Sequence, residues 1–230
     1  MSIIVNGTRA KNVVFNGKNA LYVKNKTSTN IYTRPGVEWT SGYYFAGGAR
    51  YANGLWVGCH NYLYWSEDGK KWTRCSEMLG YFAGGARYAN GLWVACNTSG
   101  KCLYWSENGK TWTQAKISYN YFYGGARYAN GLWVACSSTG TGGVGLYWSE
   151  DGKTWTQSNI TSGSFAGGAR YANGLWVACG SNDNGLYEST DGKTWTQFNI
   201  TSGSFAGGAR YANGLWVASG KSAGCYSEGI

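Results

Sequence analysis

Apolar and polar positions repeat along this chain in a fixed order. Eleven residues, Gly-Gly-Ala-Arg-Tyr-Ala-Asn-Gly-Leu-Trp-Val, occur five times without substitution, starting at Gly47, Gly84, Gly124, Gly167 and Gly207. Each copy predicts a strand, an Asn-Gly turn and a second strand. The second strand reads Leu-Trp-Val-Ala-Cys in three copies, and this unbroken apolar run predicts burial on both faces. A period near 40 residues with this content indicates a stack of sheets, as in the blades of a propeller.

A second motif lies between the copies and combines Ser, Asp or Asn, Gly and Trp at fixed spacing. Its four occurrences are Ser66, Asp68, Gly69 and Trp72; Ser106, Asn108, Gly109 and Trp112; Ser149, Asp151, Gly152 and Trp155; and Ser189, Asp191, Gly192 and Trp195. An Asp or Asn side chain in this context accepts hydrogen bonds from turn amides, and the glycine takes a positive φ. Because Asn108 replaces aspartate in one occurrence, we interpret these side chains as structural turn acceptors and not as catalytic acids.

This second motif resembles the Asp box, or bacterial neuraminidase repeat, whose pattern is Ser-x-Asp-x-Gly-x-Thr-Trp. The resemblance implies that each box closes the hairpin between the third and fourth strands of a propeller blade, and that its Trp folds back into the blade. We therefore predict an all-β fold: a five-bladed β-propeller of four-stranded antiparallel blades over residues 31–230, preceded by a short N-terminal β-hairpin segment.

The last predicted blade is incomplete where the sequence stops. Residues 224–230 match the beginning of a third strand and its box, but no fourth strand follows them. Residues 31–40 resemble a degraded copy of the missing part, with Trp39 at the position of the box Trp. We predict that residues 31–40 close blade five, because closure removes the exposed strand edges of an open array.

Residues 1–30 lie outside the repeat and carry Asn-Gly pairs at 6–7 and 16–17, which predict a β-hairpin or meander that serves for attachment. This segment, followed by boxes, resembles tail or tail-fibre proteins of bacteriophages of gut bacteria. The resemblance implies that residues 1–30 have phage virion proteins as partners and that the chain is associated with a virion.

Composition narrows the classes of partner. The formal net charge of +9 favours anionic partners, but no basic run or nucleic-acid-binding motif is present, so nucleic acid is not expected. Four of the seven cysteines share one repeat position and are expected to be small buried residues, and there is one histidine. We therefore expect no metal site and no cofactor. We also find no signal peptide and no membrane span, which predicts synthesis in the bacterial cytoplasm.

Sequence variation concentrates in the loops that should lie opposite the Asn-Gly turns and boxes, and rigid folds present binding residues in this way. The candidate ligand-binding residues are Tyr43, Tyr44, His60, Tyr62, Tyr81, Tyr119 and Tyr121, with the repeated Arg50, Arg87, Arg127, Arg170 and Arg210. Exposed tyrosines suit contacts with sugars or proteins. For the arginines, the alternative is a structural role, in which they pair with carbonyls of neighbouring blades or with box acids.

The inventory of acids argues against an enzyme. All Asp and Glu residues except Glu77 and Asp183 lie in or beside the boxes or their degenerate copies, so no carboxylate pair for glycoside hydrolysis is evident. We predict a non-catalytic recognition module that binds a glycan or an anionic cell-surface polymer at several sites, as part of a phage tail. The alternative is a structural or protein-interaction scaffold without a small-molecule ligand.

Overall fold

The structure is a computed structural model, and it describes only part of the chain. The described residues are 42–75, 80–99, 102–117, 121–138, 145–181, 185–198, 200, 203–220 and 224–227, together with four short strands between residues 4 and 21. The chain divides into two compact units, Met1–Gly42 and Tyr43–Ile230. Residues 31–40, the predicted closing strand, lie outside the described residues, as does the predicted boundary at residue 30.

The first unit contains two antiparallel hairpins. Strand β1 (Ile4–Val5) pairs with β2 (Thr8–Arg9), and β3 (Asn12–Phe15) pairs with β4 (Lys18–Leu21). Each pair is joined by the two residues of a predicted Asn-Gly turn, and these turn residues are themselves outside the described set. The short N-terminal segment therefore forms two hairpins of the kind that the Asn-Gly spacing predicts.

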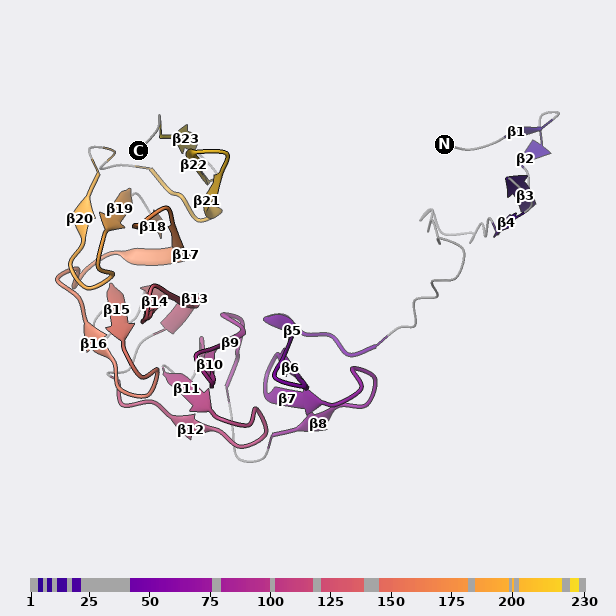
Figure 1. Ribbon diagram of the computed structural model, residues 1–230, viewed down its shortest axis with the longest axis horizontal. Coiled ribbons are helices and arrows are strands. Elements are labelled where there is room, and N and C mark those ends of the chain that lie inside the picture. The colour runs from indigo at the N-terminus through magenta and orange to yellow at the C-terminus, as the bar shows by residue number, and fades with distance from the viewer. Residues whose placement is uncertain are drawn as a thin grey trace. The chain divides into compact units, whose positions relative to one another are not determined.

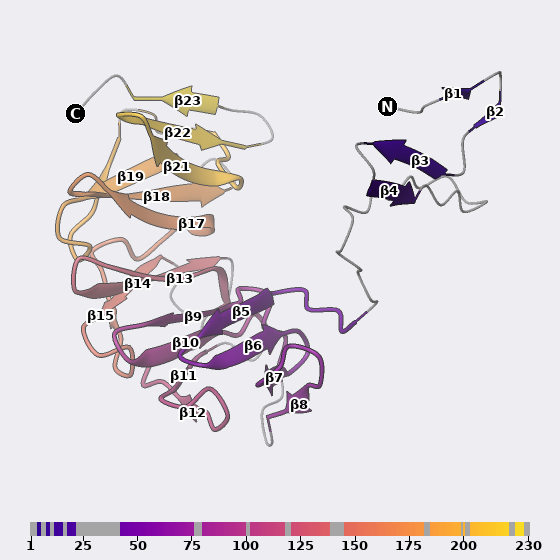
Figure 2. The ribbon, with the colours of Figure 1, turned by 45° about the vertical axis from the view of Figure 1, so that its right-hand side comes forward.

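The second unit consists of five antiparallel sheets (Figures 1 and 2), each formed by strands consecutive in the sequence. The first two sheets contain β5 (Gly48–Ala52), β6 (Leu55–Cys59), β7 (Leu63–Ser66) and β8 (Thr73–Arg74), then β9 (Ala86–Ala89), β10 (Leu92–Cys96), β11 (Leu103–Ser106) and β12 (Thr113–Gln114). The third and fourth contain β13 (Tyr121–Ala129), β14 (Leu132–Ser138), β15 (Leu146–Ser149) and β16 (Thr156–Gln157), then β17 (Ser164–Ala172), β18 (Leu175–Ser181), β19 (Leu186–Ser189) and β20 (Thr196–Gln197). The fifth has three described strands, β21 (Gly208–Ala212), β22 (Leu215–Ser219) and β23 (Gly224–Tyr226). The predicted all-β class and the five blade-like sheets are confirmed.

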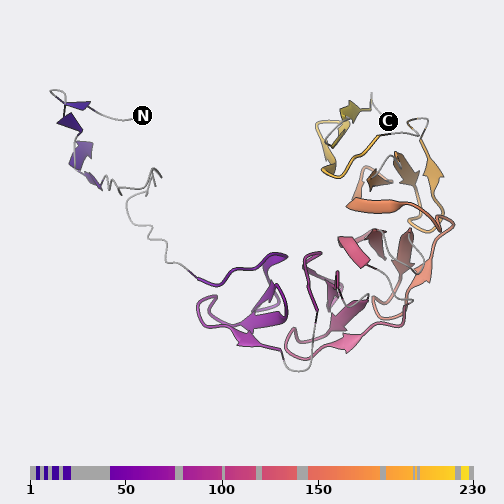
Figure 3. The same ribbon diagram turned by 180° about the vertical axis from the view of Figure 1, so that it is seen from behind.

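Within this unit the sheets follow one another along an arc, with β5, β9, β13, β17 and β21 on its inner side (Figures 1 and 3). The first and second strands of each sheet are joined by the predicted Asn-Gly turn. In the first turn Asn53 has φ 49° and Gly54 has φ 74°, and the other four turns repeat these values closely. Two consecutive positive φ angles define a type I′ turn, the connection whose twist matches that of a hairpin.

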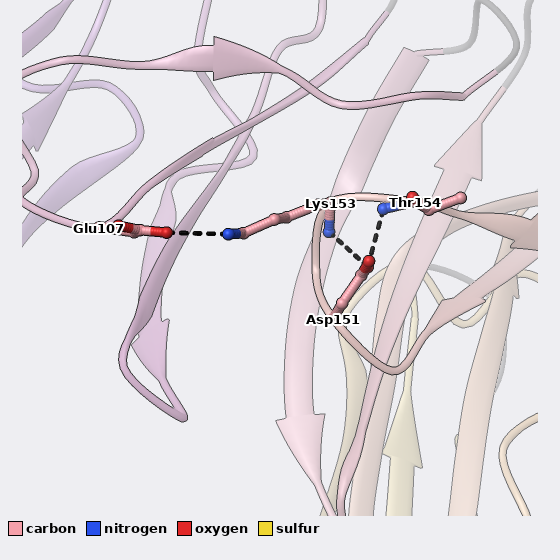
Figure 4. A network of polar contacts seen from close by, with 4 residues as sticks. All are labelled: Glu107, Asp151, Lys153 and Thr154. Carbon is pink, nitrogen blue, oxygen red and sulfur yellow. Dashed lines mark hydrogen bonds and ion pairs between the residues drawn. The ribbon is translucent and has the colours of Figure 1, made fainter.

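The box motifs form the turns between the third and fourth strands, and we call residues 66–72, 106–112, 149–155 and 189–195 the box turns. In the third one, the Oδ1 atom of Asp151 accepts hydrogen bonds from the amides of Lys153 and Thr154, both at 2.8 Å (Figure 4). The amide of Gly152 donates to Ser149 Oγ at 2.8 Å. Asn108 accepts the equivalent amides of its turn through its own Oδ1, at 2.9 Å. The position therefore requires an acceptor oxygen and not a charge.

The core lies between neighbouring sheets. At the first junction Leu55 and Val57 of one sheet pack with Trp93 and Ala95 of the next, and these four side chains are at most 5% exposed. Three further junctions repeat this arrangement. Glycines allow the inner strands to approach: a Cβ added to Gly85 would lie 2.7 Å from the carbonyl oxygen of Gly47 in the preceding sheet. The repeated Gly-Gly pair is therefore required by contact between sheets.

Among the described residues, the two terminal sheets each have one face without a neighbour. On β22 the side chains of Leu215 and Val217 are 39% and 51% exposed, although their equivalents Leu55 and Val57 are buried. A Cβ on Gly48, the equivalent of Gly85, would have nothing within 4 Å. A cavity of about 510 Å³ lies between the fourth and fifth sheets, lined by Leu186, Trp216 and Tyr226 among others. At the preceding junction the box residue Trp195 belongs to the buried core.

Candidate functional site

The predicted variable face is formed where the inner strands begin and the second strands end. Tyr44 precedes β5, His60 directly follows β6, and Tyr81 precedes β9, so these residues come from two adjacent sheets. The amide of Phe82 donates a 2.7 Å hydrogen bond to the carbonyl of His60, which ties the two segments together. Tyr81 is held within its own sheet, because its carbonyl accepts a 2.6 Å hydrogen bond from the Thr98 hydroxyl.

Tyr44, His60 and Tyr81 form a contiguous aromatic group, which we call the aromatic triplet. The ring centroids of Tyr44 and His60 are 5.2 Å apart at 76°, and those of His60 and Tyr81 are 5.8 Å apart at 69°. Both contacts are edge-to-face, the geometry that ring quadrupoles favour. Tyr44 remains 75% exposed. The structure thus brings together three of the residues that the sequence nominated separately.

The polar feature of the triplet is the Nδ1 atom of His60. It is buried and has no hydrogen-bond partner among the residues that the structure describes. A buried nitrogen without a partner costs about 1–3 kcal/mol, and a ligand hydroxyl or amide could remove this cost. The exposed Tyr44 ring next to such an atom offers a flat surface for stacking beside a directional polar group. This combination suits a small polar ligand with an apolar face, such as a sugar ring.

The triplet is not repeated at the other junctions. At the second junction Asn97 takes the place of His60, between Tyr81 and Tyr121. The third junction keeps only Tyr121, beside Ser137 and Ser164, and the fourth has small residues at all three positions. Next to the fourth junction, the Ser181 hydroxyl donates a 2.8 Å hydrogen bond to the Ser164 hydroxyl. The surface therefore changes from aromatic to small and polar along the arc, so the five sheets do not present equivalent sites.

The remaining predicted tyrosines lie in other contacts. Tyr43 stacks on Phe45, with centroids 6.0 Å apart at 9°, on the first sheet. Tyr62 lies under the guanidinium of Arg74, 4.6 Å from its ring centroid. Tyr121 pairs with Tyr123 at 6.4 Å, and Tyr119 is outside the described residues.

Sequence reasoning missed two of these partners. Arg74 replaces the glutamine that the other repeats have on their fourth strand, and Tyr123 replaces the alanine that precedes Gly-Gly in the other copies. Both departures from the repeat were visible in the sequence and could have singled out these residues.

The five repeated arginines occupy one register position on the inner strands. Each is paired across the ladder with the valine of its second strand, as Arg127 is with Val134. The Nη1 atom of each arginine donates to the carbonyl of the alanine directly before it, at 2.8 to 3.4 Å. These carbonyls belong to the same strand, so the hydrogen bonds found among the described residues do not go to a neighbouring blade or to box acids. One nitrogen of each side chain is thus held beside the backbone of its own strand.

The other reactive groups do not form a catalytic centre among the described residues. Burial raises the pKa of Cys96, Cys136 and Cys179 to about 12 each, so these thiols stay protonated and are poor nucleophiles. No group of three His, Cys, Asp or Glu side chains that could hold a metal ion occurs in the described ranges. Glu77 and Asp183 lie outside them. No helix in the described part of the chain is long and apolar enough to cross a membrane.

Comparison with known proteins supports the fold alone. No family model and no curated protein matches the chain. Among solved structures, the computationally designed Ika8 protein is similar with a TM-score of 0.51 at 8% identity, covering 74% of this chain and 54% of that one. The chain therefore spans about half of that protein, and the shared architecture is propeller-like.

Two further solved structures are more distant. The Bacteroides ovatus xyloglucan PUL GH43B protein has a TM-score of 0.33 at 11% identity, covering 66% of this chain and 40% of that one. The protein of a BT0996 RGII complex has a TM-score of 0.29 at 10% identity, covering 74% of this chain and 80% of that one.

Proposed function

We propose that this chain is a non-catalytic recognition module that binds a glycan at the junction of its first two sheets. The observation that carries the proposal is the aromatic triplet, in which an exposed Tyr44 ring adjoins a buried His60 nitrogen without a partner among the described residues. A sugar ring can stack on the exposed Tyr44 ring, and a rotation of the His60 ring toward solvent would let one of the sugar hydroxyls donate to Nδ1. At the second junction Asn97 replaces His60, but it is fully buried and its Oδ1 already accepts a 2.9 Å hydrogen bond from the Ser99 amide. Multivalent binding would therefore use unequal sites, with the first junction as the strongest.

The proposal of a non-catalytic role rests on what surrounds His60. Its ring neighbours are two tyrosines, whereas a catalytic imidazole needs a group that orients it, usually a carboxylate. Asp68, Asp151 and Asp191 are engaged in the box turns, at the other end of the strands. We expect the purified chain to release no product from sialosides or other fluorogenic glycosides above a heat-inactivated control. Turnover that disappears in His60→Ala would contradict this.

A glycan array with four variants tests the binding proposal. Tyr44→Ala and His60→Ala should lose most of the signal at the glycans that bind the unaltered chain, while Tyr44→Phe keeps the ring and should retain it. Tyr123→Ala is the matched control, because Tyr123 is 47% exposed and lies outside the triplet. Far-ultraviolet circular dichroism verifies that each variant is folded. If the array stays dark, or if Tyr44→Ala and Tyr123→Ala bind alike, the triplet is not the glycan site.

We further propose that the five sheets close into a five-bladed ring of Asp-box type, with residues 31–40 as the outer strand of blade five. The support comes from the first and fifth sheets, each of which has a face that a neighbouring sheet could cover. Leu215 and Val217 are exposed where their equivalents are covered by the next sheet, and Gly48 keeps the positive φ of its repeat although nothing adjoins it. The phage-tail role of residues 1–30 stays a prediction from resemblance.

The alternative function is a protein-interaction scaffold. It is favoured by the same exposed apolar residues, Leu215, Val217 and Tyr226, if the last sheet remains free in solution. The two functions differ in one measurement. A scaffold gives no binding signal on the glycan array. It forms concentration-dependent complexes through its last sheet, and Val217→Lys would abolish these complexes.

A further inference from the structure

The inner side of the second unit carries a row of like charges. Arg50, Arg87, Arg127, Arg170 and Arg210 each stand on one inner strand, and the inner strands are neighbours along the arc (Figure 3). Because every arginine has the same register position, the head groups are stacked from sheet to sheet and not scattered over the surface. We call these five residues the arginine row. The repeat places one of them on each inner strand, so the row brings five positive charges together.

No carboxylate neutralises the arginine row within the described part of the chain. The ion pairs found there, Lys110 with Glu67, Lys153 with Glu107 and Lys193 with Glu150, all lie at the box turns. The charged groups that act on Arg127 are instead Arg87 and Arg170, because the nearby thiols of Cys96 and Cys136 stay protonated. Like charges held together in a partly buried place destabilise the fold unless counter-ions join them.

Burial and the charges of neighbouring arginines lower the pKa of several guanidinium groups in the row. Burial, together with the charges of Arg87 and Arg170, lowers the pKa of Arg127 to about 9. Burial also lowers the pKa of Arg87, helped by Arg50 and Arg170, and that of Arg170, helped by Arg210. The guanidinium groups of neighbouring inner strands therefore act on one another electrostatically, as their shared register position and the contacts between the inner strands lead one to expect.

The head groups also retain unused donors. Each guanidinium donates from Nη1 to the carbonyl of its own strand, which fixes its position beside the backbone. Among the described residues no hydrogen bond is found for the other nitrogen atoms of these guanidinium groups, which can donate further bonds. A fixed guanidinium fork matches the paired oxygens of a phosphate or sulfate group, and such charge-assisted bonds are about twice as strong as neutral ones.

We infer that the arginine row is a binding site for an anion that carries several phosphate or sulfate groups, centred on Arg87, Arg127 and Arg170. A chain of such groups can satisfy successive arginines, and each contact removes part of the repulsion between them. The site is distinct from the aromatic triplet, since it lies on the inner strands and not on the loops, and it does not depend on the proposed glycan function.

Titration calorimetry with inorganic tripolyphosphate at low ionic strength tests this site. The unaltered chain should bind with saturation, and Arg127→Gln should weaken binding by about tenfold or more, as expected for the loss of charge-assisted hydrogen bonds. Arg74→Gln is the matched control, because it removes the same charge from an outer strand and should bind as the unaltered chain does. Arg127→Lys keeps the charge without the fork and should bind with intermediate strength.

A second measurement separates a ligand site from a structural arginine. In buffer free of multivalent anions, Arg127→Gln should unfold at the same temperature as the unaltered chain or higher, since a repulsion has been removed. Tripolyphosphate should raise the unfolding temperature of the unaltered chain and of Arg74→Gln much more than that of Arg127→Gln. If Arg127→Gln fails to fold, Arg87→Gln and Arg170→Gln take its place in both measurements.

The source of the anionic groups is resolved by a parallel titration with a sulfated oligosaccharide. Binding of either probe that depends on Arg127 supports the site, and the preferred probe identifies a free oxyanion or a sulfated glycan. Equal binding by Arg127→Gln and Arg74→Gln, or no binding of either probe to the unaltered chain, would overturn the inference. Tyr44→Ala should leave tripolyphosphate binding unchanged, so failure of the glycan proposal and failure of this one give different results.

Discussion

The Nζ atom of Lys110 in the second sheet lies 2.8 Å from Oε1 of Glu67 in the first sheet. The same ammonium group lies 4.2 Å from the centroid of the Trp65 ring, so one lysine makes an ion pair and a cation–π contact across the junction. Lys153 and Lys193 repeat both contacts at the next two junctions. The lysines of the second, third and fourth box turns therefore link their sheets to the preceding ones at the surface, beside the buried core.

A double-mutant cycle on this link should give a small but measurable coupling. Both partners are well exposed, at 39% for Lys110 and 69% for Glu67, so solvent screens the pair and we expect a coupling of about 0.2–1 kcal/mol from Lys110→Met and Glu67→Gln. Lys110→Met should cost more than Glu67→Gln, because it also removes the contact with Trp65, worth about 0.5–1 kcal/mol. Urea unfolding of the four proteins measures both quantities. Equal effects of the two single substitutions would show that the cation–π contact contributes nothing.

The box turns should make the stability sensitive to acid. Hydrogen bonds from the amides of Lys71 and Lys70 and from the Ser66 hydroxyl lower the pKa of Asp68 from 3.8 to about 2. Because the folded-state pKa lies below the unfolded one, the stabilisation is fully present above about pH 3.8 and is lost as the pH falls toward 2. Asp68→Asn keeps the acceptor oxygen, as Asn108 does in the second turn, and should flatten this dependence. Urea unfolding midpoints between these pH values provide the comparison, and identical slopes for the two proteins would contradict the assignment.

Much of the fold could be predicted from the sequence because the repeat makes each local signal recur. The Asn-Gly pairs specified type I′ turns, and Asn108 showed in advance that the box acids act as hydrogen-bond acceptors. The aromatic triplet could be predicted only in part. Tyr44, His60 and Tyr81 were each nominated as departures from the repeat, but their contact depends on how two sheets pack, which no local pattern encodes.

The contacts of the five repeated arginines could not be predicted from the sequence. Five identical residues at one repeat position suggested equivalent pairing with a partner, and the sequence offered box acids and neighbouring carbonyls as candidates. The structure directs each head group to the carbonyl before it, as Arg127 is directed to Ala126 at 2.9 Å. The distance between Arg87, Arg127 and Arg170 depends on the spacing of the inner strands, a tertiary quantity set by the Gly-Gly contacts.

A pair of glycine substitutions tests whether the ring closes. Gly85→Ala places a methyl group 2.7 Å from the Gly47 carbonyl oxygen at φ 75°, whereas Gly48→Ala has the same backbone strain at φ 77° but nothing within 4 Å. In an open array Gly48→Ala should cost only the strain of about 1–2 kcal/mol, and Gly85→Ala should cost an additional 1–3 kcal/mol or so for overpacking. We expect equal costs, since closure would place Gly207 against Gly48 as Gly47 lies against Gly85. A markedly milder Gly48→Ala in urea unfolding would show that the first sheet stays free.

Truncation locates the segment that completes the last sheet. Removing residues 1–28 should leave the unfolding of the second unit unchanged, because the hairpins β1–β2 and β3–β4 belong to the first compact unit. Removing residues 1–41 should lower the unfolding temperature, since the predicted outer strand and Trp39 are lost and the cavity beside Trp216 stays open to water. The expected loss is several kcal/mol out of a total that is usually about 5–15 kcal/mol.

Full-length Trp39→Ala separates the tryptophan from the rest of that strand, and it should reproduce a large part of the loss. Lys26→Ala, between the hairpins and the first truncation point, is a control that should not change the unfolding temperature. Sedimentation velocity on the chain lacking residues 1–41 provides the second readout, because an open edge next to Val217, which is 51% exposed, should promote association between copies. If both truncations unfold at one temperature and stay monomeric, residues 31–40 do not complete the fifth sheet, and its exposed face is available to a partner.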